Sequence, residues 1–132
     1  MAATCCIERR CSTSHPLSGD PATARKRIIT TPGGLVGVLD NELQETRFKR
    51  CDDGAKVSYA ELEITGIISN RAGMVSTLLA PQDDIHEMLN VTQKNTVEVH
   101  VYGKDLANMQ RLQFDVGNRS VKFFASAKYD NC

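Results

Sequence analysis

The sequence predicts an all-β protein, a small β-sandwich or β-barrel built as a single domain. Short apolar or alternating runs recur about every eight to twelve residues, and clusters of Gly, Pro, Asn and Asp separate them. The one helical pattern, residues 105–112, is short, and the chain contains no internal repeat. A chain of 132 residues is long enough to bury one modest core.

The predicted strands begin after residue 27, where an aperiodic segment gives way to short apolar runs. Residues 1–27 mix Cys, Ser, Thr, Pro and charge and are expected to be a flexible extension, and residues 28–132 are expected to form the β domain. Residues 51–54, Cys-Asp-Asp-Gly, predict a turn whose glycine suits a positive φ. The predicted strands are residues 34–39, 43–50, 57–64, 66–70, 74–79, a strand from Ile85, 96–102, 109–114 and 121–124.

The composition is that of an ordinary globular protein, with 41% apolar and 24% charged residues. A formal net charge of zero argues against electrostatic binding to nucleic acid or to an anionic membrane. The basic run 25–27 is short and is interpreted as a solvated linker. No apolar run approaches the roughly 18 residues of a membrane span. The N-terminus lacks the apolar core of a secretory signal, so a cytoplasmic location is expected, with an organellar transit peptide as the alternative.

The cysteines form no disulfide framework, because five is an odd number and two of them are adjacent in sequence. Reduced thiols in a reducing compartment are therefore expected. Cys5, Cys6, Cys11 and His15 lack the Cys-x2-Cys step of common zinc sites. A disordered tail is favoured over a zinc cluster at this end of the chain.

The strand predicted at residues 96–102 carries a polar stripe. Alternate residues of a strand point the same way, so its three valines share one face, and Thr96, Glu98, His100 and Tyr102 share the other. The ordinary interpretation places the valines in the core and the polar face in water. In a small barrel the polar face can line the lumen instead, where His100 and Tyr102 would share a hydrogen bond and orient a substrate.

A Pro/Asp turn delivers a histidine to the start of another strand. Residues 81–86 read Pro-Gln-Asp-Asp-Ile-His, and the proline stiffens the turn that aims His86. Asn90 is expected to close the next turn through its side chain. His86 is therefore either a surface histidine beside Asp83 or Asp84, or a metal ligand that points into the protein.

The pattern Pro81-x-Asp83-x-x-His86-x-x-x-Asn90 resembles the second conserved motif of cupins. Together with residues 37–48 and 99–102 it makes the chain similar to thiol dioxygenases of the cysteine dioxygenase type, from about residue 34 to 131. The resemblance implies a cupin-type small β-barrel (a double-stranded β-helix, or jelly roll) in which three histidines hold ferrous iron and oxygen is inserted at a thiol sulfur. It also implies that His86 is a metal ligand and that His100 and Tyr102 are catalytic residues that position the substrate and the oxygen.

The chain departs from this family at the first two metal ligands. The resemblance implies a His-x-His pair one strand before Leu43, near residues 27–30, where the sequence reads Arg-Ile-Ile-Thr. A single imidazole does not hold ferrous iron tightly. His15 would complete a triad with His86 and His100 only if the N-terminal extension became ordered. The barrel is thus expected to be incomplete at its N-terminal edge. Either the protein is a degenerate member of this family, or its N-terminal part has been replaced.

Two functions follow from the resemblance. The first is an Fe(II)-dependent thiol dioxygenase, an oxidoreductase that uses O2 to convert cysteine or a related small thiol to a sulfinic acid, impaired by the missing pair. The alternative is a non-catalytic cupin-like module that binds a small ligand or a partner chain. A sheet edge left exposed would also favour self-association with another copy. Neither a nucleic acid nor a membrane is expected as a partner.

Overall fold

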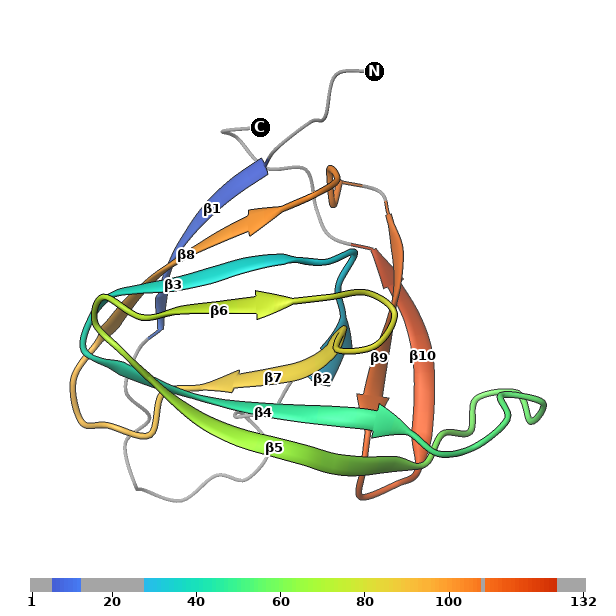
Figure 1. Cartoon of the computed structure of the whole chain (residues 1–132). Coiled ribbons are helices and arrows are strands. Elements are labelled where there is room, and N and C mark those ends of the chain that lie inside the picture. Colours follow the sequence, from blue (N-terminus) through green and yellow to red (C-terminus); the bar gives the residue numbers. More distant parts are fainter. Residues whose placement is uncertain (1–5, 13–27, 108, 126–132) are drawn as a thin grey trace.

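The computed structural model describes residues 6–12, 28–107 and 109–125, and this part of the chain forms two antiparallel sheets (Figure 1). The four-stranded sheet has the order β1-β8-β3-β6, and the six-stranded sheet has the order β10-β9-β2-β7-β4-β5. The strands are β1 Cys6–Ser12, β2 Ile28–Thr30, β3 Gly34–Asp40, β4 Glu42–Arg50, β5 Leu62–Arg71, β6 Val75–Leu78, β7 Ile85–Leu89, β8 Thr96–Tyr102, β9 Gln110–Asp115 and β10 Ser120–Ala125.

The all-β prediction is confirmed, and the two facing sheets have the architecture of a small jelly-roll β-sandwich. The strands that the structure describes do not close into one continuous barrel, because no ladder joins the two sheets. The short helical candidate at 105–112 contains no helix over its described residues, and β9 begins within it at Gln110. Over the same residues, no helix is long and apolar enough to cross a membrane.

One pair of predicted strands is corrected. The short runs expected at residues 57–64 and 66–70 are a single long strand, β5, which follows a loop over residues 51–61. The ladder between β4 and β5 shifts its register between Arg47 and Phe48, so a β-bulge lets the strand continue through Gly66. The predicted turn is present within the loop, and Gly54 has a φ of 74°.

Part of the segment expected to be an extension is a strand. Residues 6–12 form β1, which pairs with β8 from Cys6 opposite Tyr102 to Ser12 opposite Thr96. Residues 1–5, 13–27, 108 and 126–132 lie outside the described part of the chain. The basic run at 25–27 and the interpretation of His15 as a ligand therefore fall outside it too.

Both faces of the six-stranded sheet carry buried apolar and buried polar side chains. Its core cluster includes Phe48 and Ile85, which are paired across β4 and β7, and is completed by Ile28, Ala60 and Phe114. Neighbouring residues of a strand point to opposite faces. Arg47 and His86, which are also paired, therefore point away from this cluster and toward the four-stranded sheet. Val36, Val38, Leu43 and Leu78 are buried apolar residues elsewhere in the molecule.

Candidate functional site: two buried polar clusters and an open pocket

His86 is buried, with 3% of its surface exposed, so its interpretation as a surface histidine is wrong. Its strand, β7, lies between β2 and β4, and His86 pairs with Ile29 on one side and with Arg47 on the other. Residues paired across a sheet project to the same face. His86 therefore shares its face with the side chains of Arg47 and of Glu45, two residues earlier on β4.

Glu45 is fully buried and is the acceptor at the centre of this cluster. Its Oε2 accepts hydrogen bonds from Asn70 Nδ2 at 3.1 Å and from the Ser76 hydroxyl. Its Oε1 accepts one from Arg47 Nε at 3.1 Å and lies 3.6 Å from His86 Nδ1. Both carboxylate oxygens are therefore engaged, as a buried charge requires.

Arg47 connects the two sheets. Its Nη2 donates to Ser76 Oγ at 2.8 Å and to the Thr77 carbonyl at 2.9 Å, and both acceptors belong to β6 of the opposite sheet. Its side chain is 20% exposed, so the guanidinium reaches from Glu45 in the interior to the edge of the four-stranded sheet. We call Glu45, Arg47, Asn70, Ser76 and His86 the interior ion cluster.

The pKa of Glu45 shows how strongly this cluster favours the charged carboxylate. Burial alone would raise that pKa, but the nearby His86 ring, the hydrogen bonds from Ser76 and Asn70, and the charge of Arg47 together outweigh it. The pKa is lowered from 4.5 to about 2. Glu45 is therefore an anion over the whole physiological pH range, with Arg47 as its fixed counter-ion.

The second cluster is the polar stripe of β8. Thr96, Glu98, His100 and Tyr102 are all buried, so the ordinary interpretation, with this face in water, is wrong. The Tyr102 hydroxyl is 3.0 Å from His100 Nδ1, which confirms the hydrogen bond expected for the alternative arrangement. On the other side of the ring, His100 Nε2 is 3.4 Å from Glu98 Oε2. The three side chains form a buried row along one strand.

The turn after β7 has the expected chemistry. Asn90 Oδ1 accepts a hydrogen bond from the Thr92 amide at 3.0 Å, and Asn90 Nδ2 donates to the Lys94 carbonyl at 2.7 Å. The prediction that Asn90 closes this turn is confirmed. Its role is to hold the chain between β7 and β8, the strands that carry the two clusters.

The residues around His86 do not fit a ferrous iron site. On the β2 side, where a His-x-His pair was expected, the chain presents Ile28, Ile29 and Thr30. On the β4 side the neighbour is the cation Arg47, which shares Glu45 Oε1 with His86. Across the described residues, no three side chains of His, Cys, Asp or Glu gather where they could hold a metal ion. One imidazole and one carboxylate beside a guanidinium lack the ligands that iron needs.

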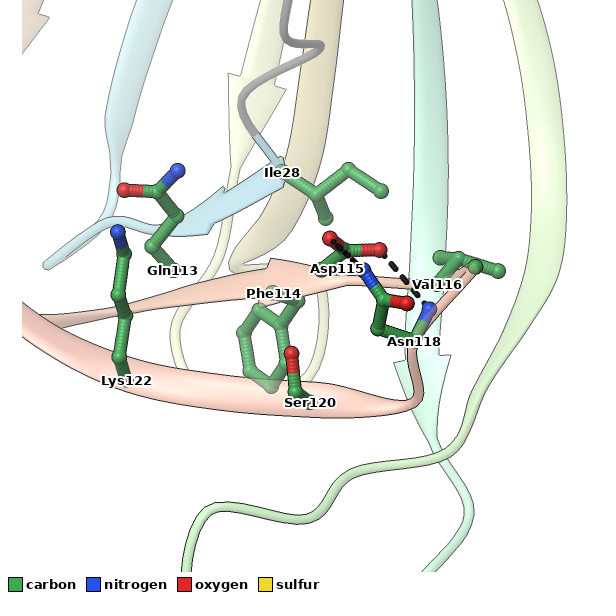
Figure 2. Close-up of a pocket in the computed structure, with 9 residues that line it drawn as sticks. Ile28, Gln113, Phe114, Asp115, Val116, Asn118, Ser120 and Lys122 are labelled. Atoms are coloured by element: carbon green, nitrogen blue, oxygen red, sulfur yellow. Dashed lines mark hydrogen bonds between the residues drawn. The ribbon is translucent and has the colours of Figure 1, made fainter.

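A pocket of about 570 Å³ opens at the β9–β10 hairpin (Figure 2). Lys122 and Gln113 lie on one side of it, and Asp115, Asn118 and Val116 lie on the other. Asp115 Oδ1 accepts the Asn118 amide at 3.0 Å, and Oδ2 accepts Asn118 Nδ2 at 2.8 Å, so the turn is held in one shape. The remaining lining residues are Ile28, Phe114, Gly117 and Ser120.

The sequence did not identify Glu45, Arg47, Ser76 or the pocket residues as functional candidates. The available signal was Glu45-x-Arg47, an acid and a base two apart on a predicted strand, which places opposite charges on one face. That pattern is typical of a solvated face, and only the pairing of β4 with β7 shows that it lies beside His86. The pocket carries no sequence motif at all.

No family model matches this chain, and a search of curated proteins finds no match.

Proposed function

We propose that the protein is a non-catalytic jelly-roll module that binds a small molecule, and that the ligand occupies the pocket at the β9–β10 hairpin. The pocket carries this proposal: its volume of about 570 Å³ is that of a small-molecule site, for which roughly 300–1,000 Å³ is usual. Two paired strands form its walls, and strands position side chains more rigidly than loops do.

The polar groups of the pocket lie on one face of the hairpin. Gln113 is paired with Lys122, and Asp115 with Ser120, so these four side chains project to the same side. Among the described residues, Lys122 has no carboxylate within ion-pair distance, whereas Asp115 is already held by Asn118. The ammonium group of Lys122 favours a ligand with an anionic head on that side of the pocket.

The interior clusters support a binding role less directly. Glu45, Arg47 and Ser76 are hydrogen-bonded to one another, and His100 is hydrogen-bonded to Tyr102, so most of these buried groups have partners within the protein. Such networks fix the relative position of the two sheets. The interior therefore supplies a rigid scaffold, and the hairpin pocket supplies the site.

The proposal is tested by titrating the full chain, labelled with ¹⁵N, with three probes of equal size: benzoate, benzylamine and benzyl alcohol. Amide shifts should be confined to the residues that line the pocket, and benzoate should bind most tightly. Val116→Trp should weaken benzoate binding by about tenfold by filling the pocket, because Val116 lines it. Val57→Trp is the matched control, since Val57 is an exposed valine in another loop.

Two results would contradict the proposal. If none of the probes shifts pocket amides at concentrations of about 10 mM, the pocket is not a binding site. If both tryptophan variants weaken binding equally, the shifts report a general change in the protein rather than occupation of the pocket.

A thiol dioxygenase is the second candidate, and the buried hydrogen bond between His100 and Tyr102 favours it. The resemblance gives this pair a role in positioning substrate, and its arrangement suits that role. The candidate requires an iron site that the described residues do not supply. Oxygen uptake that depends on both added iron and cysteine, and that is lost in His86→Ala, would establish it in place of the binding module.

A further inference from the structure

We infer that Arg47 closes a latent divalent-metal site, with its guanidinium standing where a metal ion would have to bind beside Glu45 and His86. This inference concerns the interior ion cluster and does not depend on the ligand proposed for the hairpin pocket. It rests on the register of two strands, on the contacts of one carboxylate and on the charge of one side chain.

Three positions converge on this site because of how β4 and β7 pair. Arg47 and His86 are directly opposite each other, and Glu45 is on the same face of β4, two residues before Arg47. Directly opposite side chains have Cβ atoms about 5 Å apart, and diagonal ones such as Glu45 and His86 are roughly 7–8 Å apart, still within reach of long side chains. The 3.6 Å between Glu45 Oε1 and His86 Nδ1 shows that two of the three already meet.

The guanidinium makes the contacts that a metal would otherwise take. Arg47 Nε donates to the same carboxylate oxygen, Glu45 Oε1, that faces His86, at 3.1 Å. Its position is fixed further by the Ser76 hydroxyl and the Thr77 carbonyl of the opposite sheet, at 2.8 and 2.9 Å. An added divalent cation would lie against this fixed positive charge, in an interior where charge repulsion is screened far less than in water.

Replacing the cation with a donor should therefore open the site. Arg47→His leaves two imidazoles and one carboxylate on a single face, which is the donor set of non-haem Fe(II) sites and also suits Co(II) and Zn(II). Glu45 already presents its Oε1 to His86 Nδ1 at 3.6 Å. Asn70 and Ser76 would continue to hold its other oxygen and so orient it.

The test is an anaerobic titration of the full chain with Co(II), followed by visible absorption and by the thermal midpoint. The wild type should show no saturable binding up to about 1 mM, and Arg47→His should bind about one Co(II) per chain at least about 100-fold more tightly. Arg71→His is the matched control, because Arg71 is a largely exposed arginine that pairs with Glu42 on the surface, and it should behave as the wild type does. Adding Glu45→Gln to Arg47→His should abolish the binding.

The inference is overturned if the wild type binds Co(II) tightly and loses it in His86→Ala, because Arg47 would then not exclude metal. It is overturned equally if Arg47→His is folded, as judged by its NMR spectrum, and binds no better than Arg71→His. If Arg47→His does not fold, Arg47→Asp decides the question. This variant replaces the cation with a carboxylate donor beside Glu45 and His86, and it should gain Co(II) binding that is lost when His86→Ala is added.

Discussion

Replacing Glu45 with glutamine removes the carboxylate on which the interior ion cluster is centred while preserving its size. Wild-type Glu45 accepts hydrogen bonds from Arg47, Asn70 and Ser76, and its pKa is lowered from 4.5 to about 2. At about 1.4 kcal/mol per pKa unit, that difference corresponds to roughly 3 kcal/mol of folding free energy at neutral pH. The side chain is fully buried, so solvent does not screen this contribution.

The pH dependence of this contribution has a definite sign. Because the pKa of Glu45 is lower in the folded protein than in the unfolded chain, the carboxylate stabilises the fold above pH 4.5. That stabilisation is lost as the pH falls from 4.5 toward about 2, where the folded-state carboxylate itself takes up a proton. Glu45→Gln does not titrate and should lack this part of the acid sensitivity.

The assay is urea unfolding of both proteins between pH 2.5 and 7.5, with Glu63→Gln as a control for an exposed glutamate on β5. The free energy of unfolding of Glu45→Gln should be roughly 3 kcal/mol below that of the wild type at pH 7, and the gap should narrow steadily below about pH 4.5. A loss under about 1 kcal/mol at pH 7, or a gap that stays constant with pH, would refute the reasoning. The first result would mean that Arg47 and Ser76 are satisfied without the carboxylate.

Three further outcomes are expected. Tyr102→Phe should lower the free energy of unfolding by about 1–2 kcal/mol in urea, because it removes the hydrogen bond to the buried His100, and an unchanged midpoint would contradict this. Gly34→Ala should lower the free energy of unfolding by at least about 2 kcal/mol, because an added Cβ would lie 2.2 Å from a backbone carbonyl oxygen. Gly66→Ala is the control, because an added Cβ there meets nothing within 4 Å and should leave the free energy of unfolding nearly unchanged. Asp84→Asn should raise the thermal midpoint at pH 7 but not at pH 3, because burial raises the pKa of Asp84 and so penalises its ionised form. Equal changes of the midpoint at both pH values would contradict this prediction.

The alternation of β8 could be predicted from the sequence, but the direction in which it faces could not. Thr96, Glu98, His100 and Tyr102 were correctly placed on one face, yet the ordinary rule puts such a face in water. The structure buries all four, because their strand lies in the middle of the four-stranded sheet and turns this side toward the other sheet. Which face is internal depends on long-range packing, which alternation does not encode.

The interior ion cluster could not be predicted for a related reason. His86 was identified from its turn, but its partners come from β4, some forty residues earlier, and from β6. Sequence spacing does not show which strands pair. The same limit explains the error at β5, where the alternating pattern from Val57 suggested a strand. Asp52 holds that segment as a loop, because its carboxylate accepts hydrogen bonds from the Gly54 and Glu61 amides, both at 2.9 Å.

The central claim, that His86 is paired with an internal ion cluster rather than with a metal, is tested most directly by the iron content of the wild-type protein. The full chain would be loaded anaerobically with ferrous iron, desalted and measured by elemental mass spectrometry, with His86→Ala treated in parallel. We expect less than about 0.1 iron per chain in both proteins, because Arg47 holds the position beside Glu45 and His86. About one iron per wild-type chain, lost in His86→Ala, would contradict the account and restore the dioxygenase as the leading function.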